Sequence, residues 1–152
     1  MNDDIAKQLR LDVLLCFAAY SASHAFSRFY RPLLDELGLT YPQFIVMMVL
    51  WEHQRITMKA LADQVMLESN TLTPLLKKLE ALELITRSRN RDDERVLDIE
   101  VTKAGMAMKL DGQRAALALA EATGETLEGM LDLQQRLVKA RENVARHVEK
   151  AA

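Results

Sequence analysis

The 152-residue sequence is poor in the residues that cross-link or break a chain: it has 1 Cys, 5 Gly and 3 Pro. A single cysteine excludes an internal disulfide framework and a zinc site made from several cysteines of one chain. Glycine and proline punctuate short strands and turns, so their scarcity favours long helices over a loop-rich all-β fold. The predicted fold class is therefore mainly α.

An excess of one charge and a long hydrophobic run are also missing. The 20 Lys and Arg against 22 Asp and Glu leave a net charge of −2, which argues against binding polyanions by bulk charge alone. No stretch without Lys, Arg, Asp or Glu is longer than that from Val13 to Ser27, which is shorter than the roughly 20 apolar residues that span a bilayer. The N-terminus is acidic where a secretory signal is basic. We expect a cytoplasmic protein without membrane contact, in which a lone thiol stays free.

Apolar residues instead recur at steps of three or four, the period of an amphipathic helix. A first long helix is predicted from Asp12, its N-cap, to Leu37, with Gly38 in the position of a left-handed C-cap. Pro32 is an interior residue that is expected to bend this helix.

Three shorter helices follow. Thr40 and Gln43 have the spacing of a capping box at the start of the first, and Thr57 is placed to cap the second. The third begins near Ser69, with Pro74 expected in or near its first turn.

The period then changes to that of short strands. Strands are predicted at Ile85–Arg89 and at Val96–Val101, where apolar and polar residues alternate, with the polar turn Asn90–Glu94 between them. The short link Met66–Glu68 between the two preceding helices is typical of a helix-turn-helix. A helix-turn-helix followed by a charged hairpin is a winged helix-turn-helix, which we assign to residues 41–101.

Long helices are predicted on both sides of this segment. Thr102 caps one that runs to about Ala122, and a last helix follows a break at Gly124. A chain of this length cannot fold three long helices onto one small centre, so their apolar faces are expected to pack against a second copy. Residues 1–40 and 102–152 are therefore predicted to form the dimerisation bundle of a homodimer.

A winged helix-turn-helix has the chemistry to bind double-stranded DNA. Its second helix enters the major groove with side chains for bases and phosphates, and its hairpin places a cation in the minor groove. The candidates on the helix and hairpin are Ser69, Asn70, Thr71, Thr73, Pro74, Lys77, Lys78 and Arg87. Residues 77–95 contain six cations and five acids, so their net charge alone does not indicate DNA binding. The alternative is that this segment is an ordinary solvated surface.

The turn and its flanks resemble a known signature. Asp93-Glu94-Arg95 followed by Val101-Thr102 is similar to the wing of the MarR family (multiple antibiotic resistance regulators), and the segment from Leu72 through Pro74 to Arg87 resembles its organic hydroperoxide resistance branch. The resemblance covers nearly the whole chain and is strongest from about Leu11 to Thr102. It implies DNA binding, with Arg95 as the minor-groove residue and Asp93 as its support.

The single cysteine lies near the start of the first predicted helix, where free N–H groups and the helix dipole favour a thiolate. Cys16 is then either a peroxide-reactive thiol or a small residue packed in an apolar face. Tyr20 lies one turn further on the same face. Tyr30 lies fourteen residues on, roughly 21 Å along a helix, so it can reach Cys16 only from a second chain. Ordinary helix packing of these tyrosines is the alternative.

The resemblance favours the reactive thiol. In the hydroperoxide regulators a cysteine at this position senses peroxide, and two tyrosines of the other subunit hydrogen-bond to it; the matching residues are Cys16, Tyr30 and Tyr41. Some members of the branch also have a second, resolving cysteine, which this sequence lacks. An oxidised Cys16 would therefore react with a small thiol from solution or with a backbone nitrogen, or it would be oxidised further. Phe17, Phe26 and Trp51 are expected to shape an apolar pocket for an organic hydroperoxide.

The resulting hypothesis is a homodimeric repressor that leaves a palindromic operator when organic hydroperoxide oxidises Cys16. Two alternatives remain: a MarR-type repressor released by a small phenolic ligand, and a thiol peroxidase, for which strands and a resolving cysteine are lacking. We expect a protein that is not an enzyme and needs no cofactor. His24, His53 and His147 are isolated, so no metal site is predicted.

Overall fold

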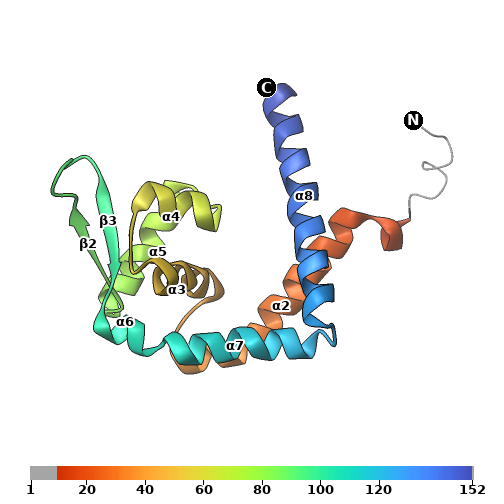
Figure 1. Ribbon diagram of the computed structural model, residues 1–152, viewed down its shortest axis with the longest axis horizontal. Helices are drawn as coiled ribbons and strands as arrows, with labels where there is room; N and C mark the ends of the chain where they lie inside the picture. The colour runs from red at the N-terminus through yellow and green to blue at the C-terminus, as the bar shows by residue number, and fades with distance from the viewer. Residues whose placement is uncertain (1–9, 152) are drawn as a thin grey trace. The chain divides into compact units, whose positions relative to one another are not determined.

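The computed structural model describes residues 10–151, which are mostly helical with one small sheet (Figure 1). The chain divides into two compact units between Ala115 and Ala116. The elements of the first unit are η1 (Leu11–Val13), α2 (Leu15–Leu37), α3 (Tyr41–His53), β1 (Arg55–Thr57), α4 (Met58–Val65), α5 (Ser69–Ala81), β2 (Ile85–Arg89), β3 (Leu97–Val101), α6 (Lys103–Ala107) and the start of α7 (Lys109–Ala122). The second unit contains the rest of α7 and α8 (Leu127–Ala151).

The first long helix starts later than predicted. Asp12 lies in the short 3-10 helix η1, and its carboxylate accepts hydrogen bonds from Arg10 at 3.0 and 3.1 Å instead of capping α2. The residue before α2 is Leu14, which has no side-chain acceptor for the first turn. The end is as predicted: α2 continues past Pro32 and stops at Gly38, whose φ of +68° is left-handed.

Helices α3, α4 and α5 pack together with the sheet, and their apolar residues form the core of the first unit. The side chains that are essentially inaccessible are Phe44, Val46, Met47, Leu50, Leu61, Leu72, Leu76, Leu79, Ile85 and Ile99. Two predicted caps hold the ends of these helices. Gln43 accepts from the backbone N–H of Thr40 at 2.8 Å, and Thr57 accepts from that of Ala60 at 3.2 Å.

Helix α5 begins at Ser69 as predicted, and Pro74 lies in its second turn, next to the first. Proline removes the hydrogen bond that the carbonyl of Asn70, four residues earlier, would accept. Both residues are exposed, so water can satisfy this carbonyl and the helix continues.

The predicted hairpin is confirmed, and it belongs to a three-stranded antiparallel sheet in the order β1-β3-β2. The strands β2 and β3 extend as a long hairpin from the group of α3, α4 and α5 (Figure 1). Strand β1 was not predicted, because three residues are too few to show an alternating pattern. It pairs with β3 with Thr57 opposite Asp98, which makes β3 the central strand.

After the sheet, Thr102 caps a helix as predicted, accepting from Gly105 N–H at 3.0 Å. The single helix expected up to Ala122 is instead two helices, α6 and α7, separated at Met108. The indole N–H of Trp51 donates to the carbonyl of Gly105 at 2.8 Å, beside this break. A tertiary hydrogen bond of this kind leaves no periodic signal in the sequence.

The second unit ends in the 25-residue helix α8, which follows a turn at Gly124 with φ of +71°, as predicted. None of the side chains of α8 is buried. Its apolar residues Leu127, Leu131, Leu133, Leu137, Val144 and Val148 are between 47% and 70% exposed. Among residues 10–151 no single helix is both long and apolar enough to cross a membrane; α2 and α3 meet the two requirements only as a pair, which is bent by 71°.

Candidate functional site

Helix α5 turns one face to the core and the other to solvent. Leu72, Leu76 and Leu79 are fully buried, which leaves the side of the helix with the candidate DNA-binding residues free. Those that are exposed are Ser69, Asn70, Thr71, Pro74, Lys77 and Lys78. Thr73 is half-buried, and its hydroxyl donates to the carbonyl of Ser69 at 2.7 Å, within its own helix. The α5 surface therefore offers hydroxyls, one amide and two cations to a partner.

Arg87 of β2 is tied to α5. Its guanidinium donates to one carboxylate oxygen of Glu80 from Nε at 3.0 Å and from Nη2 at 2.5 Å. The hydrogen bond from Arg87 lowers the pKa of Glu80, although burial works in the opposite direction. The Arg87 side chain is only 21% exposed, so this cation links α5 to the wing before any partner is present.

The tip of the β2–β3 hairpin, residues 90–96, which we call the wing tip, presents Arg95. Its side chain is 90% exposed, and both Nε and Nη2 donate to the two oxygens of Asp93 at 3.0 Å. The backbone N–H of Arg95 also donates to Asp93 at 3.0 Å. These bonds lower the pKa of the Asp93 carboxyl. The bidentate pair fixes the plane of the guanidinium while leaving it open to solvent.

A second carboxylate lies at the base of the wing tip. Asp98 of β3 is only 4% exposed, and one of its oxygens accepts from the Arg55 guanidinium at 2.5 Å and from the Asn90 amide at 2.9 Å. The hydrogen bond from Arg55 is the main cause of the lowered pKa of Asp98. Sequence reasoning missed this cluster, because Arg55 comes from the unpredicted strand β1 and the alternating pattern of β3 treats Asp98 as an ordinary polar position.

Asn90 connects this cluster to the wing tip. Its side-chain oxygen accepts from the backbone N–H groups of Asp92 at 2.9 Å and Asp93 at 3.2 Å, the arrangement of an Asx turn. The backbone N–H of Asn90 donates to the carbonyl of Val96 at 2.9 Å and closes the turn. The same asparagine side chain therefore contacts the buried carboxylate and the backbone that presents Asp93.

Cys16 is the second residue of α2, and its side chain is exposed in the single chain. Tyr20, one turn further along, is 60% exposed and packs on the ring of His24 with 4.3 Å between ring centroids. The exposed Phe17 lies 6.5 Å from the Tyr20 ring. The start of α2 thus carries an open thiol beside a short aromatic row.

Tyr30 and Tyr41 come together at the other end of α2. Their ring centroids are 5.3 Å apart, and Tyr30, which is buried, also packs on Phe44 at 5.4 Å. Burial raises the pKa of both hydroxyls, and each therefore stays protonated at neutral pH. Because α2 is continuous from Leu15 to Leu37, Cys16 and Tyr30 are roughly 21 Å apart along the helix of one chain.

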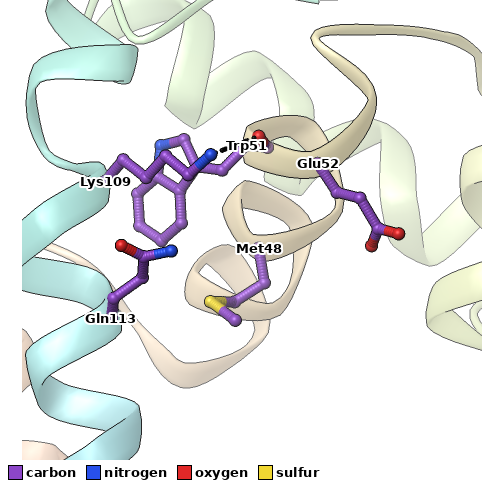
Figure 2. A pocket seen from close by; sticks show the side chains of 5 residues that line it. All are labelled: Met48, Trp51, Glu52, Lys109 and Gln113. Carbon is purple, nitrogen blue, oxygen red and sulfur yellow. Dashed lines mark hydrogen bonds between the residues drawn. The ribbon is translucent and has the colours of Figure 1, made fainter.

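Trp51 lines a pocket to which the exposed Phe17 and Phe26 do not contribute. Trp51 is 3% exposed, and it shares this pocket, between α3 and α7, with Met48, Glu52, Lys109 and Gln113 (Figure 2). The Lys109 ammonium donates to the Trp51 carbonyl at 3.1 Å, the bond drawn dashed in Figure 2. No group of three or more potential metal ligands occurs within residues 10–151.

Comparison with known proteins shows a consistent set of relatives. A family model described as transcriptional regulator SarA/Rot matches residues 28–111. The organic hydroperoxide resistance transcriptional regulator of Bacillus subtilis is 41% identical over 123 residues, which is 79% of this chain and 84% of the relative. The HTH-type transcriptional regulator TtmR of Methylorubrum extorquens is 42% identical over 134 residues, 88% of this chain and 69% of the relative.

The chain belongs to the MarR family, in the branch of organic hydroperoxide resistance regulators. Among solved MarR-type structures, AbfR of Staphylococcus epidermidis is 33% identical and aligns with a TM-score of 0.75 over 95% of this chain and 97% of AbfR. A reduced form of AbfR bound to DNA aligns with the same score over 93% of this chain and 98% of AbfR. The MarR fold confirms the predicted winged helix-turn-helix, and the protein is a transcriptional regulator whose relatives bind DNA.

Proposed function

We propose that this regulator is a homodimeric peroxide sensor that represses transcription from a palindromic operator. Organic hydroperoxide oxidises Cys16, and the oxidised dimer leaves the DNA. The observation that carries the proposal is the single exposed thiol at the start of α2, in a chain 41% identical to an organic hydroperoxide resistance regulator. A repressor of this kind acts in the cytoplasm, where its DNA and small thiols are found.

For the DNA half, the exposed face of α5 enters the major groove with Ser69, Asn70, Thr71 and Lys77. The wing tip places Arg95 in the minor groove, where a guanidinium is favoured by the negative potential. Lys78 and Arg87 contribute charge near the phosphates. The free helix face and the exposed Arg95 support this assignment. Two α5 helices of a dimer would read half-sites about one DNA turn, roughly 34 Å, apart.

For the dimer, we propose that residues 1–40 and 102–152 form the interface, with residues 41–101 as the DNA-binding region. The uncovered apolar side chains of α8 support this division, since a helix with no buried side chain needs a partner. Antiparallel packing of two α2 helices brings Tyr30 and Tyr41 of one chain to Cys16 of the other. Their neutral hydroxyls are donors suited to a thiolate.

The redox step is a two-electron transfer. The Cys16 thiolate attacks the outer oxygen of the hydroperoxide, the O–O bond breaks, and the alkoxide takes a proton to leave as an alcohol. The product is a sulfenic acid. A small thiol then displaces its hydroxyl as water and forms a mixed disulfide with Cys16. The chain has no second cysteine, so the thiol that forms this disulfide comes from solution.

Oxidation removes the negative charge that the two tyrosines bind and adds bulk between the α2 helices. The α2 pair then shifts, and the distance between the two DNA-reading helices no longer fits the operator. An operator-binding assay with and without cumene hydroperoxide tests this. We expect the parent to lose binding and Cys16→Ser to keep it. Equal release of the parent and Cys16→Ser would contradict the proposal.

A second candidate is release by a phenolic ligand. A pocket of about 400 Å³ next to Tyr41 is lined by Arg28, Arg31, His24 and Ser27, a set that suits a phenolic carboxylate. Under this alternative a phenolic acid such as salicylate would release both the parent and Cys16→Ser, and peroxide would release neither.

A further inference from the structure

We propose that Asp98, together with Arg55 and Asn90, is a positioning group for Arg95: it sets the conformation in which the wing tip presents its guanidinium to DNA. The inference rests on the proposed role of Arg95 in the minor groove. It adds three residues, none of which needs to touch DNA, to the set that determines operator affinity.

Asp98 is held in place by the sheet. It lies on the central strand β3, opposite Thr57 of β1 and Ser88 of β2, so both of its neighbours hold it in register. Its carboxylate is almost completely buried, and it keeps its charge because Arg55 and Asn90 both donate to the same oxygen. A buried carboxylate with two donors is a fixed anchor, since leaving it without partners is costly.

Hydrogen bonds connect this anchor to the wing tip through Asn90. One end of the Asn90 amide donates to Asp98, and the other end accepts from the backbone of Asp92 and Asp93. Asp93 in turn holds Arg95 through three hydrogen bonds. Each link is a hydrogen bond between 2.9 and 3.2 Å, so a continuous chain of bonds runs from the buried carboxylate to the exposed guanidinium.

Within residues 10–151 the other hydrogen bonds of the wing tip are backbone bonds inside the turn, from Asn90 N–H to the Val96 carbonyl and from Val96 N–H to the Asp93 carbonyl, both at 2.9 Å, and they do not connect it to the core. Arg91, Asp92, Glu94 and Arg95 are exposed, and the residues of the turn contribute no side chain to the buried core. An unsupported polar turn samples many conformations, and DNA binding must then restrict them at the expense of affinity. A turn already held by Asn90 avoids that loss.

The direction of the change in operator affinity distinguishes the positioning role from a simple effect of charge. Asp98→Asn removes a negative charge from the region that approaches the phosphates, and Coulomb attraction alone predicts tighter binding. The positioning role predicts weaker binding, by about threefold to tenfold, the range expected when one or two more side chains must be ordered. Asn90→Ala changes no charge and leaves the Arg55–Asp98 pair intact, and it is expected to weaken binding similarly.

The experiment is a double-mutant cycle on operator affinity, measured with the full-length reduced protein at fixed salt. The variants are Asp98→Asn, Asn90→Ala, Arg95→Ala and the two doubles with Arg95→Ala, with thermal melting to confirm that each is folded. Asp92→Asn is the control, because its carboxylate makes no hydrogen bond within residues 10–151 while its charge change matches that of Asp98→Asn. The control is expected to bind as tightly as the parent or more tightly.

We expect each single variant to bind more weakly than the parent, and neither Asp98→Asn nor Asn90→Ala to weaken binding further once Arg95 is alanine. Parent-like affinity of Asn90→Ala would overturn the inference, and so would losses that simply add to that of Arg95→Ala, which indicate general damage to the fold. If Arg95→Ala itself binds like the parent, the proposed role of Arg95 in the minor groove is wrong. This outcome is distinct from one that contradicts only the positioning role of Asp98.

Discussion

Tyr30 shows how burial at a single residue prepares a hydrogen-bond donor. Desolvation, with a contribution from the neighbouring Tyr41, raises the pKa of its hydroxyl above the ordinary value of 10.0. A group whose pKa is higher in the folded than in the unfolded state contributes its full stability below the unfolded pKa and loses it as pH rises through the folded pKa. Tyr30 therefore favours the folded state near neutral pH and opposes it under alkaline conditions.

Tyr30→Phe should make the free energy of unfolding less dependent on pH in the alkaline range. Between about pH 9 and pH 11 the urea midpoint of the parent should fall more steeply than that of Tyr30→Phe, because phenylalanine has no proton to lose. Tyr41→Phe should flatten the curve in the same direction, since burial raises the Tyr41 pKa too. Parallel curves for the parent and both variants would contradict the prediction.

Single residues also show what the sequence was able to predict. The place of Cys16 near a helix start follows from the apolar period of the first helix, and the support of Arg95 by Asp93 is what the resemblance to the MarR wing implies; the structure has both. Their assigned roles remain predictions. The burial of Asp98 could not be predicted from the sequence, because it depends on Arg55, which lies 43 residues away on a strand that local patterns do not reveal.

At the scale of elements, helices were predicted well where a cap or a repeating apolar face defines them. The start of α5, the hairpin strand β2 and the end of α2 at Gly38 agree with expectation. The errors have physical causes: the η1 turn separates Asp12 from α2, and a tertiary bond from Trp51 accompanies the break between α6 and α7. Local sequence patterns contain no information about such distant partners.

The cap on α4 gives the prediction for this scale. Helix α4 has only eight residues, and the Thr57 hydroxyl satisfies the backbone N–H of Ala60 in its first turn. Thr57→Ala should lower the free energy of unfolding by about 1 kcal/mol, the usual contribution of an N-cap hydroxyl. Urea denaturation measures this. Thr57→Ser keeps the hydroxyl and should stay closer to the parent; equal losses in the two variants would show that the methyl group matters instead.

For the whole molecule, the proposed dimer explains why so much apolar surface is uncovered. Leu133 and Leu137 of α8 are 59% and 47% exposed, and they lie one turn apart on the same helix face. The double variant Leu133→Glu with Leu137→Glu should therefore be monomeric and should bind a palindromic operator much more weakly, because two linked half-sites give a higher effective affinity than one.

Sedimentation velocity and operator titration check this expectation. Gln135→Glu is the matched control, because residue 135 lies on the opposite face of α8 from 133 and 137 and is exposed. It should remain dimeric and bind normally. A parent protein that sediments as a monomer, or a double variant that stays dimeric, would show that this face of α8 is not the interface.

The three-stranded sheet has a consequence for exchanging parts between regulators. A wing is usually regarded as a hairpin that can be moved from one protein to another with its own residues alone. Here the hairpin contains Asp98 and Asn90, but the third member of the cluster, Arg55, is on β1, between α3 and α4. A chimera that receives this hairpin without an arginine at position 55 inherits a buried carboxylate lacking its counter-ion, so the transferable unit is the hairpin together with β1.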